Sequence, residues 1–517
     1  MKLTKNSTAF TAAFMVAATL CAKVCGMLRD ILIAAMYGTS TAEAIAFSSA
    51  TRIPVLFFDI ALGSAVTSAF IPIFNDCLSS NGKSKALEFS NMFINLILVI
   101  TGILSLLGIV FARPLVNVIA GGYNGEILTL IASLVIILFP MIIFTGVAFC
   151  FVGILQSFGE FIVPSIISLV SNAFLILYIV IFKNSYGVRG VAIAMLIAWS
   201  LQLFVQIPSL YKCGYRYRPI LSFKDENIKK TCVLALPIIF SSWVQPINNL
   251  INIRLASTLS DGGSVAALDY ANRLYIILVG VFTYAVTNII FPALSRAESS
   301  GNKEEFSLIV SKGIRYVLVI IVPVMAGFLA LSTPIVRLVY ERGQFDSHST
   351  YLTASALFYY SMGMTGYAVM EVSNRAFYAM HDGKTPMIIS VCGISLNIIM
   401  SIILVSVFKL DLRALAFSAA FSANLMGLCS IIVANKRSKG ILNKDFKITI
   451  FKILVSSVIM SVFVIVTDNL IKTSSAFIAA VVPTAVGIAT YFVCCMVFKI
   501  QEVKKSLLTK LTSKFKK

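Results

Sequence analysis

Charged residues are scarce in this chain. Only 12% of its 517 residues are Asp, Glu, Lys or Arg, whereas a soluble protein carries about 25%. This composition leaves too little polar surface to cover a water-soluble globule. Histidine is nearly absent too, because the chain has only two, His348 and His381, and both fall at predicted helix ends. The sequence therefore predicts neither a histidine-based metal site nor a Ser-His-Asp triad.

The acids and the cysteines form no cluster typical of a catalytic or metal site. The acidic residues inside the predicted membrane segments are scattered singly, whereas a membrane transferase acting on lipid phosphates needs clustered carboxylates for Mg²⁺. No Gly-rich phosphate loop stands out. Cys21 and Cys25 have i,i+4 spacing, but no further Cys or His accompanies them, so we interpret them as packing residues. We expect no enzyme activity, no metal site and no organic cofactor.

Apolar residues are abundant, at 58% of the chain with a mean hydropathy of +0.93. A bilayer-spanning helix takes about 20 apolar residues, and fourteen helices would use roughly 60% of the chain. The sequence predicts an all-α polytopic membrane protein with about 14 transmembrane helices, short loops and no soluble domain. The predicted segments are 8–37, 43–75, 89–112, 127–156, 161–182, 190–211, 231–259, 264–295, 306–332, 348–381, 385–408, 414–435, 448–467 and 474–498.

The basic residues predict the orientation. The chain has 42 Lys and Arg against 22 acids, a net charge of +20, and most of them fall in the loops and tail on the side of the N-terminus. By the positive-inside rule both termini face the cytoplasm. One loop on this side carries Lys212, Arg216, Arg218, Lys224, Lys229 and Lys230. The excess is thus a topology signal rather than a nucleic-acid site, and contact of the basic tail with anionic lipid stays open.

An internal repeat at an offset near 220 residues divides the chain. Ala69-Phe70-Ile71-Pro72 recurs as Ile290-Phe291-Pro292, and Arg113-Pro114-Leu115-Val116 recurs as Thr333-Pro334-Ile335-Val336. Six helices per repeat is an even number, so the two lobes have the same orientation, as in transporters whose substrate binds between halves. We predict an N-terminal six-helix lobe (1–222), a C-terminal six-helix lobe (223–437), and two extra helices with a basic cytoplasmic tail (438–517).

Ionisable residues inside the membrane are the candidate functional residues, since each costs between about 2.5 and more than 10 kcal/mol and usually faces a cavity or a partner. They are Lys23, Arg29, Asp30, Arg52, Asp59, Arg254, Asp269, Arg273, Glu371 and Arg375. Asp269/Arg273 and Glu371/Arg375 are i,i+4 pairs on one helix face. Two interpretations stay open: each pair neutralises itself inside the bundle, or these charges line a substrate path.

Helix geometry places several cations at comparable depth. At 1.5 Å per residue, Lys23 lies about 22 Å along the first segment, and Arg29 about 9 Å further. Arg273 lies about 14 Å below the outer end of its segment, and Arg52 is at similar depth. We therefore expect cations from both lobes to line one cavity for an anionic substrate, for which phosphate suits arginine best. Lys23 and Arg29 lie about 120° apart around the helix, so their convergence needs a bend near Gly26 or a wide cavity.

Five sequence motifs follow one another along the chain. The first three are Lys23-Val24-Cys25-Gly26-Met27-Leu28-Arg29-Asp30, Ser68-Ala69-Phe70-Ile71-Pro72 and Tyr270-Ala271-Asn272-Arg273-Leu274. The more specific stretches are Tyr340-Glu341-Arg342-Gly343-Gln344-Phe345-Asp346 and the run from Arg375 to Pro386. These motifs resemble those of the MurJ/MviN lipid II flippase family of the MOP exporter superfamily, the first of them its first-helix motif. The likeness runs in order over about residues 10–440.

The resemblance implies a bacterial cytoplasmic-membrane transporter of peptidoglycan and cell wall biogenesis, and so of cell shape. It would flip the undecaprenyl-pyrophosphate-linked precursor lipid II by alternating access. By the same resemblance Lys23, Arg29 and Arg273 match the cationic cavity, with Lys23 in place of an arginine. A family arginine after Pro54 has no counterpart, and Arg52 is a candidate substitute. Glu43 matches a family acid, and the last two helices would form a groove for the lipid tail.

The energy source and two other functions stay open at this level. Candidates for gating or for binding a coupling Na⁺ or H⁺ are Asp30, Glu43, Asp59, Asp269, Glu371, Arg375 and Asp382, and the membrane potential is the other energy source. The alternatives within the superfamily are an exporter of another polyprenyl-linked oligosaccharide and a MATE-like drug/cation antiporter, for which the basic balance is unsuited. A structural component of the division machinery would need no cavity charges. The expected partners are the lipid-linked precursor, membrane lipids and, as a candidate, the cell-wall synthesis machinery.

Overall fold

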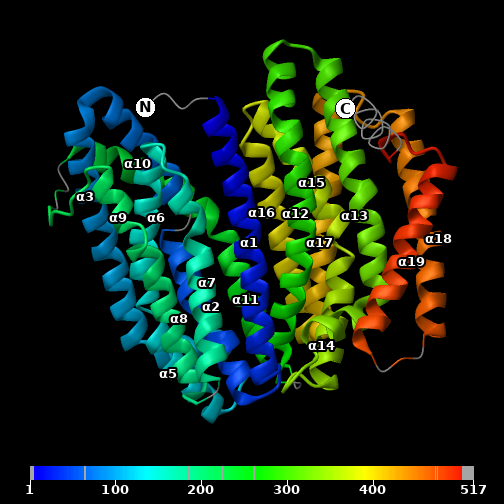
Figure 1. Cartoon of the computed structure of the whole chain (residues 1–517), viewed down its shortest axis with the longest axis horizontal. Coiled ribbons are helices and arrows are strands. Elements are labelled where there is room, and N and C mark those ends of the chain that lie inside the picture. The colour runs from blue at the N-terminus through cyan, green and yellow to red at the C-terminus, as the bar shows by residue number, and fades with distance from the viewer. Residues whose placement is uncertain are drawn as a thin grey trace. The chain divides into compact units, whose positions relative to one another are not determined.

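The computed structural model describes residues 5–62, 66–183, 185–220, 222, 225–259, 262–471, 473 and 475–503 (Figure 1). These residues are helical almost throughout and include no strand. Their contacts divide the chain into two compact units, Met1–Ala266 and Ala267–Lys517. Each unit is described by itself below.

Among its described residues, the first unit contains eleven α-helices and one π-helical turn. The helices are α1 (Lys5–Tyr37), α2 (Ala42–Ala61), α3 (Ile71–Val110), α4 (Ala112–Ala120), α5 (Gly125–Leu138), α6 (Met141–Ser157), α7 (Ile162–Phe182), α8 (Gly187–Phe204), α9 (Ile207–Lys212), α10 (Glu226–Ser242) and α11 (Val244–Ser257), with the π-turn η1 (Val66–Phe70) between α2 and α3. Gly82 interrupts α3 with φ 81° and ψ 172°, a conformation that glycine adopts without steric cost. The helix therefore consists of two parts that meet at this residue.

The second unit holds the remaining helices, the first of which begins just before the unit boundary. They are α12 (Ser264–Ser299), α13 (Lys303–Tyr340), α14 (Ser347–Ser361), α15 (Met364–Ala379), α16 (Lys384–Ile402), the π-turn η2 (Ile403–Val407), α17 (Leu412–Arg437), α18 (Lys444–Leu470) and α19 (Ala476–Val497). The pairs α15–α17, α16–α17 and α13–α14 pack against one another. They form the helical bundle of this unit.

The predicted repeat recurs as matching breaks in helices of the two units. Phe111, between α3 and α4, has φ −98° and ψ 20°, and Leu331, inside α13, has φ −119° and ψ 23°. Each break precedes an aligned proline, Pro114 or Pro334, by three residues. Because a proline ring clashes with the carbonyl four residues earlier and offers no N–H, it kinks the helix at this place. The sequence repeat and the backbone geometry thus agree at an offset of 220.

Eleven helices among the described residues are long and apolar enough to cross a membrane. Two further predicted segments are each divided into two helices. Segment 231–259 holds helices of 17 and 14 residues, and segment 348–381 holds helices of 15 and 16 residues. Each of these helices is shorter than the about 20 residues of a span. The all-α polytopic architecture is confirmed, and the number fourteen stays a prediction. Extra breaks account for two of the three segments that are not among the eleven, and the third, 8–37, is the continuous helix α1 (Lys5–Tyr37).

A single side chain closes the break between α14 and α15. The Asn424 amide on α17 donates to the carbonyl of Met362 at 2.8 Å, and its oxygen accepts the N–H of Gly366 at 3.1 Å. These two groups would pair with each other in an uninterrupted helix, so the amide is inserted into the helical ladder. Gly366 also approaches Gly427 so closely that a methyl group on either residue would overlap backbone atoms of the other helix.

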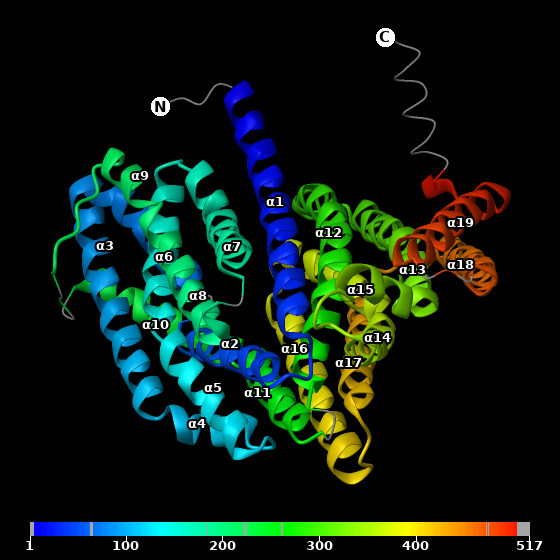
Figure 2. The ribbon, with the colours of Figure 1, turned by 60° about the horizontal axis from the view of Figure 1, so that its bottom comes forward.

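The two C-terminal helices pack on each other and on α13 (Figure 2). Pro323 inside α13 leaves the carbonyl of Val319 without its helical partner, and the Tyr491 hydroxyl of α19 donates to this oxygen at 2.8 Å. After α19, Glu502 forms an ion pair with Arg315 of α13 at 3.3 Å, and both side chains are largely buried. Polar contacts therefore fix the C-terminal pair to a proline-broken helix.

Candidate functional site

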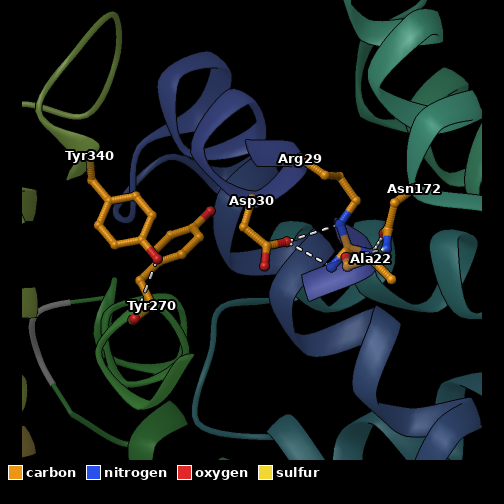
Figure 3. Close-up of polar contacts among 6 residues, drawn as sticks. All are labelled: Ala22, Arg29, Asp30, Asn172, Tyr270 and Tyr340. Carbon is orange, nitrogen blue, oxygen red and sulfur yellow. Dashed lines mark hydrogen bonds and ion pairs between the residues drawn. The ribbon is translucent and has the colours of Figure 1, made fainter. Parts of the chain in front are cut away.

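Arg29 is the best-anchored of the predicted cavity cations. Its guanidinium forms an ion pair with the adjacent Asp30 at 2.8 Å and donates to the Asn172 side chain oxygen, also at 2.8 Å (Figure 3). The Arg29 side chain is 13% exposed and that of Asp30 is 9% exposed. Hydrogen bonds with ionised partners in such surroundings are the strong ones. The arginine is thus held in one orientation and is not a freely moving surface charge.

Asn172 on α7 connects Arg29 to the backbone of α1, the helix that carries this arginine. Its amide donates to the carbonyl of Ala22 at 3.3 Å while its oxygen accepts from Arg29 (Figure 3). A Cβ on Gly26 would lie 3.5 Å from the Asn172 nitrogen, an ordinary van der Waals distance, so α7 crosses α1 at this residue. α1 is one continuous helix from Lys5 to Tyr37. Gly26 is therefore a packing position where α7 crosses α1.

The other candidates of the first unit have different surroundings. Lys23 is exposed and forms no ion pair or hydrogen bond with another described residue. Glu43 is exposed in the first turn of α2, where its charge suits the helix dipole. Arg52 and Asp59 are half-buried on the same helix, Asp59 following Pro54 by five residues. Of these candidates, Arg29 and Asp30 form an ion pair with each other.

The second unit carries the two i,i+4 pairs on different helices. Asp269 and Arg273 lie half-buried on α12, and Glu371 and Arg375 lie half-buried on α15. A tyrosine pair connects these two helices. The Tyr275 ring on α12 is 6.4 Å from the ring of Tyr367 on α15, one turn before Glu371. Aromatic rings and ionisable side chains therefore lie near one another on α12 and α15.

Two aromatic residues of the motif from Tyr340 to Asp346 belong to an aromatic cluster. Tyr340 stacks on Phe345 with ring centroids 5.6 Å apart. The Tyr340 ring also lies 5.0 Å from the ring of Tyr270 (Figure 3). All three side chains are buried, and aromatic pairs of this geometry are each worth about 0.5–1.5 kcal/mol beyond their buried area. The cluster packs the α13–α14 loop against the helix that carries Arg273.

Asp382 lies in the loop between α15 and α16, outside the membrane-spanning helices. It accepts the backbone N–H groups of Lys384 and Thr385 at 3.0 and 3.1 Å and forms an ion pair with Arg437. Hydrogen bonds from Thr385, and then Arg437, hold the pKa of Asp382 below its usual range. The carboxylate thus connects the start of α16 to the end of α17.

A largely apolar pocket opens between α13, α14 and α18 in the second unit. It has a volume of about 390 Å³. Its lining comprises Val322, Met325, Ala326, Leu329, Ala330, Phe358, Leu454, Ser457, Val458, Ser461 and Ile465. The described residues include no group of three or more His, Cys, Asp or Glu side chains that could hold a metal ion.

A family model described as lipid II flippase MurJ matches residues 33–500. The chain belongs to this family. Among its relatives, a probable lipid II flippase MurJ of Buchnera aphidicola is 28% identical over 86% of this chain and 87% of its own length. The lipid II flippase MurJ of Burkholderia cenocepacia is 27% identical over 72% and 73% of the two chains.

Solved structures agree with this assignment. A lipid II flippase MurJ in an inward closed conformation matches with a TM-score of 0.80 at 26% identity, covering 94% of this chain and 98% of the other. A multidrug MATE transporter of the MOP superfamily, inward-facing, has a TM-score of 0.68 at 17% identity, over 83% and 98% of the two chains. The latter shows that the fold is shared.

Within this member of the MurJ family, sequence reasoning missed Asn172 and Asn424. Each is an uncharged polar residue inside an apolar helix, and Asn172 is only 9% exposed. An asparagine in a membrane helix needs partners for its amide, and this signal could have been applied to both positions. What the sequence lacked was the identity of the helix that supplies each partner.

Proposed function

We propose that this protein flips lipid II, the undecaprenyl-pyrophosphate-linked peptidoglycan precursor, from the inner to the outer leaflet of the bacterial cytoplasmic membrane by alternating access. The family match over residues 33–500 carries the proposal. The basic loops and tail support an orientation with both termini in the cytoplasm.

The pyrophosphate would be bound by cations of the cavity, with Arg29 as its main ligand and Lys23, Arg52 and Arg273 contributing charge. An arginine binds phosphate oxygens through a planar fork of N–H donors. Asp30 and Asn172 already accept hydrogen bonds from the Arg29 guanidinium, so the substrate would compete with Asp30 for the N–H groups that bind this carboxylate. This competition gives a physical basis for release when the surroundings of the site change.

The polyprenyl tail would enter the apolar pocket between α13 and α18. Nearly all of the pocket surface is apolar, and Pro323 and Pro334 bend the helix that forms one wall. For gating or for binding a coupling Na⁺ or H⁺, the candidates stay those named from the sequence: Asp30, Glu43, Asp59, Asp269, Glu371, Arg375 and Asp382. The membrane potential is the other candidate energy source. A division-machinery or cell-wall partner is likewise a proposal.

Depletion of the protein in its native cell tests the function. Loss should reduce the amount of lipid II accessible on the outer leaflet, and the wild-type gene should restore it. The R29A variant should restore less than about a tenth, since charge-assisted hydrogen bonds are worth about 1.5–3 kcal/mol each. The control is K436A, which removes a cation exposed at the end of α17 and should restore fully.

Two results would contradict the proposal. The first is unchanged outer-leaflet lipid II after depletion in a cell that has no other flippase. The second is full restoration by R29A at wild-type protein level, which would exclude the assigned role of this arginine while leaving the transport function in place.

A further inference from the structure

The segment that follows α9 is fixed to α3 by two asparagines. Asn91 and Asn95 lie one turn apart on α3 and are 3% and 8% exposed. The Asn91 amide donates to the carbonyl of Arg216 at 3.1 Å, and its oxygen accepts the N–H of Arg218 at 3.1 Å. The Asn95 amide donates to the carbonyls of Arg218 and Ile220 at 3.0 and 2.8 Å. Residues 215–220, which are neither helix nor strand, thus gain a defined conformation (Figure 1).

Side chains along this segment alternate in their direction. The Tyr215 hydroxyl donates to Asn91 at 2.8 Å and the Tyr217 hydroxyl donates to Asn95 at 2.6 Å. Arg216 and Arg218, between and after them, are exposed and form no ion pair or side-chain hydrogen bond with another described residue. The hydrogen bonds that hold the backbone therefore present two unpaired guanidinium groups side by side.

Both arginines line a polar hollow of about 250 Å³. Its other walls are Ser84, Leu87, Glu88, Asn91, Gly214 and Ile220. Glu88 is the one carboxylate in this lining, so the two arginines leave the hollow with a net positive charge. A neighbouring hollow of about 580 Å³ has Lys85 against Glu88, Asp225 and Glu226, and its acidic balance is unsuited to an anion.

One end of the hollow, at Arg218, lies near the depth of lipid headgroups. Val99 is the first large apolar side chain exposed on this part of α3, and Asn95 and Asn91, which both bond to the backbone of Arg218, precede it by about 6 and 12 Å at 1.5 Å per residue. The headgroup region extends roughly 5–8 Å beyond the hydrocarbon core, so Arg218 lies at its edge, whereas Ser84, Leu87 and Glu88 of the lining lie further from the membrane. Tyr211 and Tyr217 are 64% and 52% exposed here, as is typical of membrane-interface tyrosines.

From these observations we propose that the hollow between α3 and residues 214–220 binds the phosphate of an anionic glycerophospholipid, with Arg216 and Arg218 as its ligands. Two arginine forks match phosphate oxygens in geometry and charge. The phosphodiester is the chemistry recognised, and the acyl chains would lie along the exposed face of α3 that begins at Val99. The site is separate from the flipping function, because it uses none of the cavity residues.

The test measures lipid retention on the full-length protein. Purified protein is placed in nanodiscs of phosphatidylcholine with one fifth phosphatidylglycerol, extracted, and examined by native mass spectrometry for bound phosphatidylglycerol. The R216Q/R218Q variant should lose about tenfold or more in apparent affinity. The matched control K229Q/K230Q removes the same charge from exposed positions near the start of α10 that line neither hollow, and it should stay within twofold of wild type.

Two further variants separate binding from folding and from charge. R216K/R218K keeps the charge but loses the forks, and should retain intermediate affinity. N91A/N95A keeps both arginines but frees the segment, and should weaken binding while hydrogen exchange at residues 215–220 increases. A melting temperature unchanged for R216Q/R218Q shows that the loss is local.

Three results would overturn the proposal. An equal loss in R216Q/R218Q and K229Q/K230Q would mean a general effect of charge. Retention of phosphatidylglycerol by R216Q/R218Q at the wild-type level would exclude the two ligands. Displacement of phosphatidylglycerol from the wild-type protein by millimolar inorganic phosphate would assign the site to a soluble phosphate.

Discussion

At the scale of the residue, the character of Arg29 is decided by its neighbours. An isolated arginine in a membrane helix is costly, but Asp30 and Asn172 satisfy three of its donor contacts. Asn172 is itself satisfied by the backbone of α1. The group is therefore a network in which each member fixes the next, and Asn172 acts through Arg29.

Substitution of Asn172 should impair transport without unfolding the protein. N172A removes the hydrogen bond that orients Arg29, which at about 1.5 kcal/mol corresponds to roughly a tenfold loss in substrate affinity. The measurement is outer-leaflet lipid II in depleted cells that carry the variant. S168A, an exposed position one turn earlier on α7, is the control and should behave as wild type. If N172A matched S168A, the orienting role would be wrong.

The Asp382 carboxylate should make stability depend on pH. Its pKa is lowered in the folded protein, so its stabilising contribution is present above the unfolded value of about 3.9 and is lost as the pH falls through the folded value. D382N should therefore have a lower free energy of unfolding than wild type at pH 7, by about 0.5–1 kcal/mol for a partly exposed pair. Its melting temperature should be lower accordingly. The difference should disappear as the pH decreases below about 4. A difference that is independent of pH would argue against an ionised contact.

At the scale of the element, prolines and glycines determine where helices bend and where they touch. Pro114 and Pro334 explain the paired breaks of the repeat, and Pro323 explains why the Val319 carbonyl is free for Tyr491. The close approach of Gly366 and Gly427 brings α15 and α17 together. Since α15 carries Glu371 and Arg375, the packing of these small residues positions two of the candidate charges.

The crossing of α15 and α17 should not tolerate a methyl group. In G366A the new Cβ would lie 2.3 Å from the Cα of Asn424, so the helices would have to separate, and overpacking of this kind costs about 1–3 kcal/mol. We expect a melting temperature lower by several degrees and reduced transport. G327A is the control, because a Cβ there meets nothing within 4 Å. Equal stability of the two variants would contradict the packing argument.

The ion pair between Arg315 and Glu502 should behave as a buried pair. E502A leaves an uncompensated arginine and should destabilise the protein by roughly 3 kcal/mol, whereas removal of both charges in R315M/E502L should recover much of the loss. Thermal unfolding in one detergent measures all three proteins. A double variant no better than E502A would show that the charges do not compensate each other.

At the scale of the whole molecule, the proposed orientation predicts where each loop lies. Loops after α9 and after α15, and both termini, should be protected from a membrane-impermeant thiol reagent in intact cells. The α13–α14 and α16–α17 loops should react. Single cysteines at Lys212 and His381, compared with Gln344 and Lys409 in a background free of other cysteines, measure this. Labelling of Lys212→Cys together with Gln344→Cys in intact cells would contradict the orientation.

The prediction from sequence was most successful for the architecture. Apolar length alone indicated the helices, because a bilayer forces every backbone group to be satisfied within a helix. The repeat was visible because prolines and small motifs recur at a constant offset, and the backbone breaks at Phe111 and Leu331 agree with it. The broken segments at Trp243 and Met362 were not foreseen, since the partner that stabilises such a break comes from elsewhere in the chain.

The candidate site was predicted only in part. Arg29 and Asp30 were identified because charge in an apolar segment is costly, and this cost can be read from one segment by itself. Asn172 was missed because its role depends on α7 crossing α1. Of the two ways in which Lys23 and Arg29 could converge, the bend near Gly26 is not observed, since α1 runs without interruption from Lys5 to Tyr37, and the wide cavity stays a prediction. The binding roles of Lys23, Arg52 and Arg273 stay predictions.

The scarcity of charge along the sequence thus determined, without any tertiary structure, most of what the chain is: a membrane protein, its helices and its candidate residues. These properties depend on transfer of each segment into lipid, which is a local energy. Tertiary structure alone decided which amide completes Arg29, which asparagine closes a broken helix, and which two arginines are left unpaired beside α3. Such contacts join residues from 58 to 150 positions apart, and only the packing of whole helices brings them together.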